Sequence, residues 1–448
     1  MSHGRRMMDR RKFLKMTAST GMTGFAALQG LSCATMGHLV ADVSEGGYGP
    51  LEQAGPDLKL PAGFRYKKFG IADSIMSDGY PTPAAHDGMG AFPMPNGNIR
   101  LIRNHEVGGR PIGVPIVAVN YDLLTGGGTV SLEIDPNTRE LVRDFVSLSG
   151  TAVNCAGGVT PWGSWLTCEE ITVGPEYGVD RSHGYVFEVP ASAEEPVEPV
   201  PLKAMGRFVH EAAAVDPTTG AVYLTEDQWR AGFYRFLPER PYRNGEPADL
   251  TAGGELQMLA VVGRSQLDTD WGQDVGRPLP VRWVTILDPD PENAVDAHDA
   301  VFRQGWSQGG ARFSRIEGCF YGDEGIYFSC TNGGRADLGQ IWHYRPLGPD
   351  DGELTLLFES PSQSVLDSPD NVCVSPRGMV LITEDGHYSN YVRVLTPSGK
   401  IFNFAENTAN RSEMAGPIFS PDGETLFLNI QRPGATYAIW GPWERGGL

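Results

Sequence analysis

Apolar residues recur along the chain in short runs that turn-forming residues interrupt. Beyond residue 40, no segment keeps apolar side chains at helical spacing over several turns. Instead, a short apolar run leads into a turn of Pro, Gly, Asp or Asn, and a second apolar run follows and ends in polar residues. Runs of this length with these boundaries are typical of β-hairpins. The pattern predicts an all-β protein.

The hairpin pattern occurs six times, at residues 87–106, 154–170, 210–227, 315–332, 370–385 and 413–431. Repeated hairpins on a common plan favour a ring of similar sheets. We therefore expect a six-bladed β-propeller with irregular loop insertions over 172–206 and 238–312 and an irregular N-terminal wrap over 34–85. Because a closed ring has no internal boundary, residues 34–448 should form a single propeller domain.

Four of these hairpins share one spacing between polar residues. The pairs Cys155 and Glu170, Glu211 and Glu226, Glu317 and Asn332, and Asp370 and Asp385 are each 15 positions apart. A hairpin returns the chain to the end at which it started. Both polar clusters of a hairpin should therefore lie at the same end of the ring, and all of them should converge on one mouth of the central channel.

Composition narrows the class of protein. Gly 57 and Pro 34 favour turns over long helices, and 40% apolar residues exclude a disordered chain. Lys+Arg 36 against Asp+Glu 55 gives a formal net charge of −19, which argues against nucleic acid as a partner. Six cysteines are too few for a disulfide scaffold in a chain of 448 residues.

The N-terminus is expected to be an export signal. Residues 9–15 read Asp-Arg-Arg-Lys-Phe-Leu-Lys and precede a mildly apolar stretch that ends near Leu31. Paired arginines before a short apolar run indicate a twin-arginine export signal over residues 1–33, so the translocation machinery is an expected partner. A basic terminus that runs into a surface helix is the alternative. The destination would be periplasmic or secreted, with a lipid anchor at Cys33 left open.

Acidic residues gather at the expected rim. They are, together with one thiol, Asp87, Glu106, Cys155, Glu169, Glu170, Glu211, Glu226, Asp227, Glu317, Asp370, Glu384, Asp385 and Glu413. Packing so many carboxylates together is costly unless they are protonated, paired with arginine or bound to cations. Arg103 and Arg315 are too few to balance them, so cations are favoured. Oxygen ligands suit calcium, and a thiolate beside carboxylates suits iron or zinc.

The cysteines fall into two groups. Cys155 occupies the strand position that Glu211 and Glu317 hold in other hairpins, so we expect it to be a metal ligand. Small core residues are the expectation for the other four cysteines of the repeats, which are Cys168, Cys319, Cys330 and Cys373.

Other interpretations of the rim residues stay open. Acids at strand ends also cap turns or face solvent, and ions that only staple the ring would leave the same pattern. His86, His105 and His210 precede rim acids and could ligate metal, move protons or orient a carboxylate. The sequence contains no phosphate-cradling loop between a strand and a helix and no Gly-x-Ser-x-Gly elbow.

Several of these segments resemble the PhoX family of secreted alkaline phosphatases. The most specific is the Asn-Cys-Ala-Gly-Gly block at residues 154–158. The likeness extends from about residue 80 to the C-terminus through residues 103–106, 154–170, 210–212, 223–227, 315–318, 339–342, 370–372, 383–386, 420–423 and 441–443. It implies a six-bladed propeller that hydrolyses phosphomonoesters with two ferric ions and two or three calcium ions around a bridging oxygen.

The resemblance also implies residue roles. Cys155 and Glu211 would be iron ligands, and the remaining metal ligands would be Glu106, Glu169, Glu170, Glu317, Asp370, Glu384 and Asp385. Arg315 would be the catalytic residue that holds the phosphate. The chain has no lysine between Lys203 and Lys400, so an arginine must take that role in the middle of the sequence.

The expected function is therefore metal-dependent hydrolysis of a phosphorylated small molecule by a monomeric enzyme. Bound cations would reverse the local negative charge and clamp the phosphoryl oxygens. One rival is a non-enzymatic, calcium-stapled propeller that binds a partner. The other is a propeller lactonase or phosphotriesterase, which would need one calcium and no thiol.

Overall fold

The computed structural model describes residues 47–448 except 110–111, 244 and 323–324. The expected export signal over 1–33, with Cys33, lies outside these residues. No helix within the described residues is long and apolar enough to cross a membrane. Strands dominate, as the sequence predicted. Helical structure within the described residues is short and includes α3 (Ala300–Ser307) and the 3-10 turns Pro175–Tyr177, Lys203–Met205 and Trp443–Arg445.

Hydrogen bonding groups the strands of the first half into two small sheets and the start of a large one. The four-stranded sheet contains β4 (His86–Pro93), β5 (Ile99–His105), β6 (Gly127–Ile134) and β7 (Leu141–Thr151). The three-stranded sheet contains β8 (Asn154–Val159), β9 (Ser164–Glu169) and β10 (Val186–Pro190). The large sheet begins with β11 (His210–Val215), β12 (Val222–Glu226), β13 (Tyr234–Arg240), β14 (Asp249–Val261) and β15 (Leu279–Thr285).

The second half completes the large sheet and adds two more. The large sheet continues with β19 (Gly352–Glu359), β18 (Gln340–Pro346), β17 (Gly325–Cys330) and β16 (Ile316–Gly322). The six-stranded sheet contains β20 (Pro369–Val374), β21 (Val380–Glu384), β22 (Tyr391–Leu395), β23 (Ile401–Asn407), β2 (Leu58–Pro61) and β1 (Leu51–Gln53). The last four-stranded sheet contains β24 (Met414–Phe419), β25 (Leu426–Ile430), β26 (Ala435–Trp440) and β3 (Arg65–Phe69).

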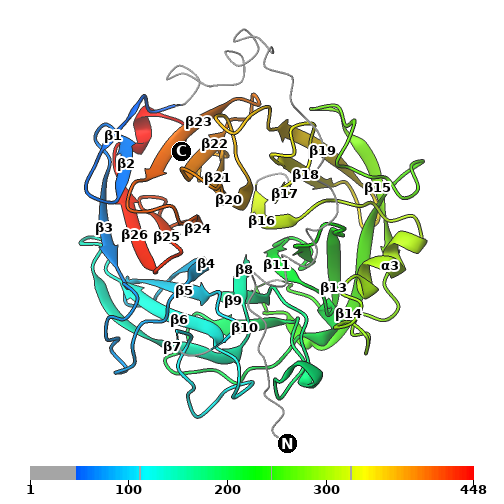
Figure 1. Cartoon of the computed structure of the whole chain (residues 1–448), viewed down its shortest axis with the longest axis horizontal. Helices are drawn as coiled ribbons and strands as arrows, with labels where there is room; N and C mark the ends of the chain where they lie inside the picture. The colour runs from blue at the N-terminus through cyan, green and yellow to red at the C-terminus, as the bar shows by residue number, and fades with distance from the viewer. Residues whose placement is uncertain (1–46, 110–111, 244, 323–324) are drawn as a thin grey trace, which may run out of the picture.

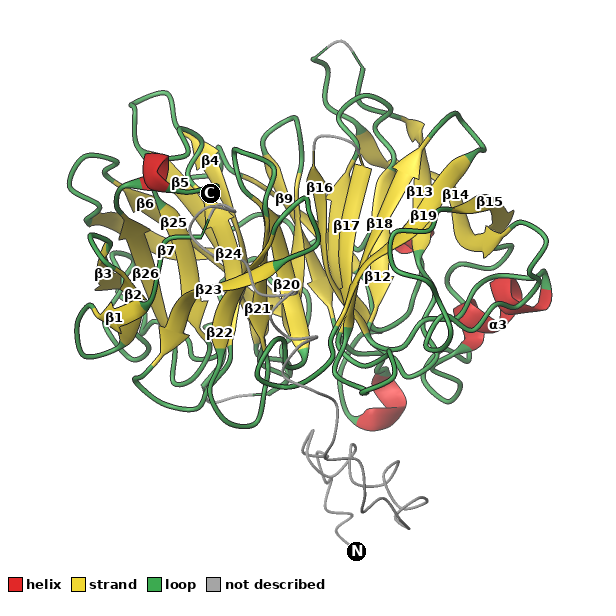
Figure 2. Ribbon diagram, turned by 90° about the horizontal axis from the view of Figure 1, so that it is seen from above, coloured by secondary structure: helices red, strands yellow, loops and turns green. Residues whose placement is uncertain are grey.

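The sheets are arranged like the blades of a propeller. Strands β4, β8, β11, β16, β20 and β24 lie nearest the axis, and each contacts the next until β24 returns to β4 (Figure 1). Figure 2 shows the sheets side by side in profile, with loops at both ends of the strands and α3 at the periphery. Near the two ends of the described chain, β3 pairs with β26, which closes the ring.

The division into sheets differs from the six separate blades that the sequence predicted. Within the described residues the strands form five sheets, and one of these sheets has nine strands. Strand β15 pairs with β14 on one side and with the end of β19 on the other, so hydrogen bonds run continuously from β11 to β16. The segment between β14 and β16 thus contains an additional outer strand, β15, which joins strands β11 to β14 to strands β16 to β19.

All three regions expected to be irregular contain regular structure. Residues 172–206 hold β10, which pairs with β9. Residues 238–312, expected as loops, hold the long strand β14, whose Leu256, Met258 and Ala260 alternate into the core. The expected N-terminal wrap holds β1, β2 and β3, which extend two outer sheet edges by pairing with β23 and β26. These strands are stabilised by partners distant in sequence. The local Pro and Gly content therefore indicated loops where the tertiary structure forms strands.

Small residues let the inner strands approach one another closely. A Cβ atom on Gly158 would lie 2.1 Å from the carbonyl oxygen of Ala213 on the neighbouring inner strand. A Cβ atom on Gly318 would lie 2.4 Å from the backbone nitrogen of Val372. Because contacts this short are forbidden, the glycines are required where six strands converge on one axis. This close approach brings the polar ends of the strands together.

Candidate metal centre

A β-bulge lies near the start of every inner strand. The pairing register shifts between His86 and Met89 in β4, and the same irregularity occurs in β8, β11, β16, β20 and β24. Five of the bulges contain an acid or a thiol directly after the last regular pair, namely Asp87, Cys155, Glu211, Glu317 and Asp370. A bulge turns a side chain out of the sheet alternation. In the sixth strand the shift begins one residue later: Ala415 still pairs with Asn429, and Gly416 is the first residue of the bulge.

The second strand of each inner hairpin contributes one residue beyond its last pair. In all six hairpins the backbone N–H of this residue donates to the carbonyl of the residue that precedes the inner strand, with N–O distances of 2.9 to 3.2 Å. The six donors are Glu106, Glu170, Asp227, Thr331, Asp385 and Gln431. A repeated hydrogen bond of this kind places the six residues at equivalent positions around the mouth of the channel.

The strand register shows that equivalent mouth residues are not always 15 positions apart, although the sequence pattern predicted a constant spacing. His210 pairs with Glu226, so Asp227 rather than Glu226 matches Glu170 and Asp385. Ile316 pairs with Cys330, so Thr331 rather than Asn332 is the equivalent residue opposite Glu317. The turns of these hairpins differ in length, and the bulges add residues that sequence spacing does not reveal.

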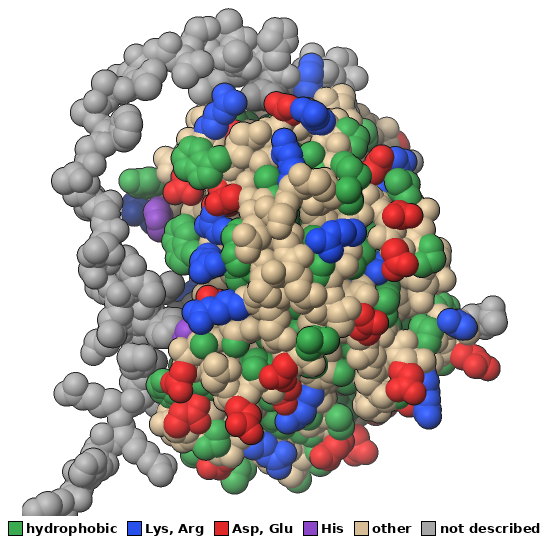
Figure 3. Space-filling view, turned by 90° about the vertical axis from the view of Figure 1, so that its right-hand side faces the viewer, with side chains coloured by type: hydrophobic (Ala, Val, Ile, Leu, Met, Phe, Trp, Pro, Cys, Tyr) green, Lys and Arg blue, Asp and Glu red, His purple; other side chains and the backbone are tan. Residues whose placement is uncertain are grey.

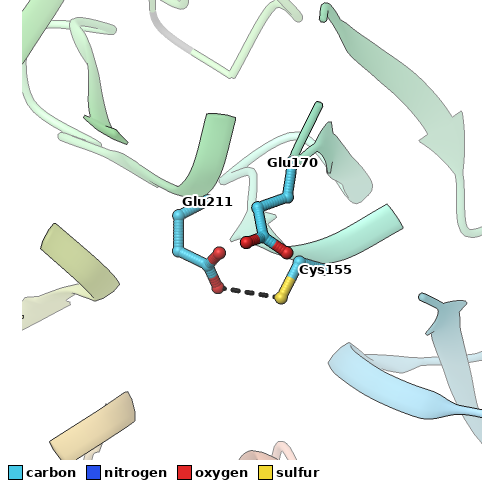
Figure 4. Close-up of side chains that lie close together, drawn as sticks. All are labelled: Cys155, Glu170 and Glu211. Atoms are coloured by element: carbon cyan, nitrogen blue, oxygen red, sulfur yellow. Dashed lines mark hydrogen bonds between the residues drawn. The ribbon is translucent and has the colours of Figure 1, made fainter. Parts of the chain in front are cut away.

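The acids and the thiol meet in three groups. Ligand atoms lie within 4.8 Å of one another in Cys155, Glu170 and Glu211, in Glu211, Glu317 and Asp370, and in Asp87, Glu106 and Glu413. Figure 4 shows the side chains of Glu170, just after the end of β9, and of Glu211, in β11, close to that of Cys155. The Sγ atom of Cys155 lies 3.0 Å from Oε1 of Glu211. Glu211 belongs to two groups and therefore joins them.

Burial and mutual repulsion make the charged forms of these groups unfavourable in the metal-free protein. Burial, followed by the neighbouring acids, raises the pKa of the Cys155 thiol well above its ordinary value. The same causes raise the pKa of Glu211 and of Asp370. Burial and the charge of Asp227 raise the pKa of Glu317 to about 8. Without metal the neutral, protonated forms are therefore favoured, whereas bound cations would favour the charged forms.

The donor atoms fit a set of cations. Oε2 of Glu211 is buried and has no hydrogen-bond partner within the described residues. Carboxylate oxygens are hard ligands that suit calcium or ferric iron, and the thiol adds one soft ligand in the first group. By contrast, Figure 3 shows Lys and Arg side chains interspersed with Asp and Glu side chains on one outer side of the protein.

Arg315 lies beside this centre. Its Nε and Nη2 atoms donate to the two carboxylate oxygens of Asp227 at 2.8 and 3.0 Å, and Nη2 also donates to Glu317 at 2.6 Å. Burial lowers the pKa of Arg315, but Asp227 and Glu317 outweigh that effect and raise it above the ordinary value. The Arg315 side chain keeps 26% of its surface exposed. A permanent cation with an accessible surface is suited to hold an anion.

Glu169 is placed differently from its neighbour Glu170. It is fully buried in its sheet and accepts hydrogen bonds from the backbone N–H groups of Ala152, Gly184 and Tyr185. His183 Nδ1 lies 2.6 Å from the same carboxylate. Burial lowers the pKa of His183, but Glu169 and Asp122 outweigh this and raise it to about 9. Glu169 belongs to none of the three groups.

Glu384 and Glu226 follow the same plan as Glu169. Glu384 accepts from Nε of Arg393 at 2.7 Å and from the backbone N–H groups of Asp367 and Tyr391. Glu226 accepts from the Tyr234 hydroxyl at 2.8 Å. The first acid of each acidic pair therefore stabilises the loop behind the mouth, whereas Glu170, Asp227 and Asp385 stand at the repeated mouth position. Asp385 lies outside the three groups, but its charge helps burial to raise the pKa of Glu413.

The other predicted residues are placed as follows. Cys168, Cys319, Cys330 and Cys373 are buried. His86, His105 and His210 are buried, and each has a ring nitrogen within hydrogen-bond distance of a backbone carbonyl. Burial lowers the pKa of His210 to about 4, so its imidazole is neutral at physiological pH.

Sequence reasoning missed Gln431. Its Nε2 atom donates to Asp87 at 2.9 Å and to Glu106 at 2.6 Å, and so ties two members of one group together. Gln431 ends the last predicted hairpin, at the place where other hairpins carry an acid. Its position equivalent to these acids could have identified Gln431 from the sequence. An amide is not an expected metal ligand of this centre, so the acidic pattern did not include it.

The fold and the site define a propeller-like β-protein with a buried centre of carboxylates and one thiol beside an arginine. A family model described as "Alkaline phosphatase PhoX" matches residues 46–434. The chain belongs to this family, so it is a phosphomonoester hydrolase. The family resemblance and the enzyme class predicted from the sequence are both confirmed.

One solved structure supports the fold over most of the chain. Pseudomonas fluorescens PhoX in complex with vanadate, described as a transition state analogue, has a TM-score of 0.69 at 19% identity, with 90% of this chain and 98% of that chain covered. A virginiamycin B lyase from Staphylococcus aureus has a TM-score of 0.44 at 12% identity, covering 84% and 99% of the two chains. A gluconolactonase from Xanthomonas campestris has a TM-score of 0.43 at 13% identity, with 88% of this chain and 99% of that chain covered. No curated protein sequence matches the chain.

Proposed function

We propose that the protein hydrolyses phosphomonoesters with a set of cations held at the mouth of the central channel. The observation that carries the proposal is the shared carboxylate of Glu211, which joins the group of Cys155 and Glu170 to that of Glu317 and Asp370. Two neighbouring cation positions that share one ligand suit a reaction in which charge develops on several phosphoryl oxygens.

Ferric and calcium ions are the proposed cations, two of the first and two or three of the second. Cys155, Glu170 and Glu211 would hold iron, because the thiol provides a ligand that calcium does not favour. Glu211, Glu317 and Asp370 would hold the adjoining ion, and Asp87, Glu106 and Glu413 a calcium ion. When bound, such ions supply Lewis acidity and activate water for attack on phosphorus.

The chain's own residues bind and orient the substrate. Arg315 is proposed to grip the phosphoryl group, because its guanidinium lies beside Glu317 and keeps part of its surface exposed. A planar donor fork matches two phosphate oxygens better than an ammonium does. Gln431 would keep Asp87 and Glu106 together. Glu169 and Glu384 would act from behind, since hydrogen bonds within the protein already occupy them.

Two further proposals concern the whole chain. We interpret the nine-stranded sheet as two blades of four strands, β11 to β14 and β16 to β19, linked by β15, which gives six blades in all. The repeated hydrogen bond at the mouth supports this count. We also propose that residues 1–33 direct export of the folded protein by the twin-arginine route, because they carry paired arginines before a short apolar run.

Elemental analysis of the purified protein, together with a hydrolysis screen, tests the proposed function. Iron and calcium should both be present, and chelation should abolish hydrolysis of a chromogenic phosphomonoester, with recovery after the ions are restored. Vanadate should inhibit, because it mimics the phosphoryl group in its transition state. Calcium alone with no hydrolysis would favour a stapled binding module. Calcium alone with lactone or triester hydrolysis would favour the rival enzymes.

A further inference from the structure

Asp227 stands at the same repeated mouth position as Glu106, Glu170 and Asp385, yet it is used differently. Glu106 and Glu170 belong to the groups of potential metal ligands, and Asp227 belongs to none of them. Both of its carboxylate oxygens instead accept hydrogen bonds from Arg315, at 2.8 and 3.0 Å. A two-bonded pairing of this kind fixes the plane as well as the position of a guanidinium.

The backbone holds the two residues in register. The N–H of Asp227 donates to the carbonyl of Val209 at 3.1 Å, and the N–H of Arg315 donates to the carbonyl of Gln228 at 2.8 Å. Thr331 in turn donates to the Arg315 carbonyl at 2.9 Å. The hairpins β11–β12 and β16–β17 are thereby joined at the point where the two side chains meet.

Arg315 adopts a left-handed conformation, with φ of +46°, that side chains larger than glycine rarely adopt. Ala85, Val153 and Ser368 hold the equivalent place before three other inner strands and share it, with φ of +53°, +49° and +53°. This entry into the inner strand is therefore a property of the repeat. In the hairpin β16–β17 the residue with this conformation is Arg315, which lies beside the acidic groups. The neighbouring hairpin β11–β12 supplies its partner, Asp227.

We propose that Asp227 is a positioning residue that orients Arg315 for phosphate binding; this inference rests on the proposed function. Glu317, the second partner of Arg315, is one of the potential metal ligands and would be drawn toward a cation. Asp227 then remains as the partner that holds Nε and Nη2. The third donor group, Nη1, makes no hydrogen bond within the described residues and is left to face the phosphoryl group of the substrate.

The test compares Asp227→Asn with wild type in the metal-loaded protein. An asparagine presents an N–H group to one of the guanidinium nitrogens, so the two-bonded pairing is lost. Affinity for inorganic phosphate, measured by calorimetry, should fall about tenfold or more. KM for a phosphomonoester should rise more than kcat falls. Iron and calcium contents should match those of wild type.

Two further variants control for folding and for general loss of charge. Asp227→Glu keeps the carboxylate and should recover most of the phosphate affinity. Asp249→Asn breaks an exposed ion pair with Arg240 (3.0 Å) on the outer strands β13 and β14 and should leave phosphate binding unchanged. In an Arg315→Ala background, Asp227→Asn should have no additional effect, because a positioning residue acts only through its partner.

The inference is overturned if Asp227→Asn loses metal in proportion to activity, because Asp227 would then be a ligand. It is also overturned if the effect persists without Arg315, or if an active wild type and Asp227→Asn bind phosphate equally. A wild-type protein that neither binds phosphate nor hydrolyses monoesters, although loaded with metal, would overturn the proposed function together with the inference.

Discussion

At the scale of single residues, neighbours in sequence take opposite roles. Glu169 is directed into its sheet and Glu170 toward the thiol of Cys155, although the two are both glutamates at the end of one strand. The sequence shows two acids in a row but not which of them faces the channel. Successive residues of a strand point to opposite sides, so a shift of one position exchanges the two roles.

Glu169→Gln and Glu170→Gln should therefore have contrasting effects. The first leaves buried backbone N–H groups and His183 without a charged acceptor and should lower the free energy of unfolding by about 1–3 kcal/mol. It should retain bound iron. Glu170→Gln should lose iron and activity with little change in stability. Urea unfolding and elemental analysis of the two variants measure both effects, and iron loss in Glu169→Gln would contradict the assignment.

Cys155→Ala should remove iron and hydrolysis while the fold remains. Its sulfur contacts Glu211 in a buried position, so the deleted atom should cost about 1 kcal/mol of stability. Cys168→Ala is the matched control, because Cys168 is equally buried but lies within β9 away from the three groups. Elemental analysis and circular dichroism should separate the variants. Unchanged iron in Cys155→Ala would rule out its role as a ligand.

At the scale of strands, the bulge and the close approach of inner strands build the centre. The apolar pattern predicted the inner hairpins well, because each must be buried between two neighbours. The bulges could not be predicted, since an additional residue in one strand leaves no mark on composition. The long strand β14 was missed for a related reason: its partner β15 lies in a stretch whose turn-forming residues indicate loops.

Gly158→Ala should severely destabilise the protein. The added Cβ would lie 2.1 Å from the Ala213 carbonyl oxygen, so β8 and β11 would have to separate. We expect a loss of about 3 kcal/mol or more in the free energy of unfolding, or failure to fold. Gly348→Ala is the control, since a Cβ there meets nothing within 4 Å, and it should stay within about 0.5 kcal/mol of wild type. Equal stabilities in urea would contradict the packing described.

At the scale of the whole molecule, acidic side chains from separate sheets gather at the mouth of the central channel. The metal-free centre keeps acids such as Glu317 protonated in the folded state, with a pKa of about 8, whereas in the unfolded chain the pKa returns to an ordinary value near 4.5. The folded protein therefore binds more protons than the unfolded chain between these values, so its stability decreases as pH rises.

Urea unfolding in the presence of chelator should show this decrease from about pH 5 to about pH 8. Calcium should restore stability at pH 8, because bound cations favour the charged carboxylates. Glu317→Gln should flatten the profile of the metal-free protein, as the amide needs no proton to be neutral. A stability that stays constant or rises over this range without metal would show that the acids do not repel one another as described.

The sequence by itself determined the all-β class, the six inner hairpins, the PhoX family and the chemical types gathered at the mouth. Each of these depends on local pattern or on residue identity. Only the tertiary structure decided which acid of a pair faces the axis, that β15 merges two groups of strands, and that Asp227 pairs with Arg315 from a different hairpin. These features depend on register and on contacts between distant segments, which no local pattern encodes.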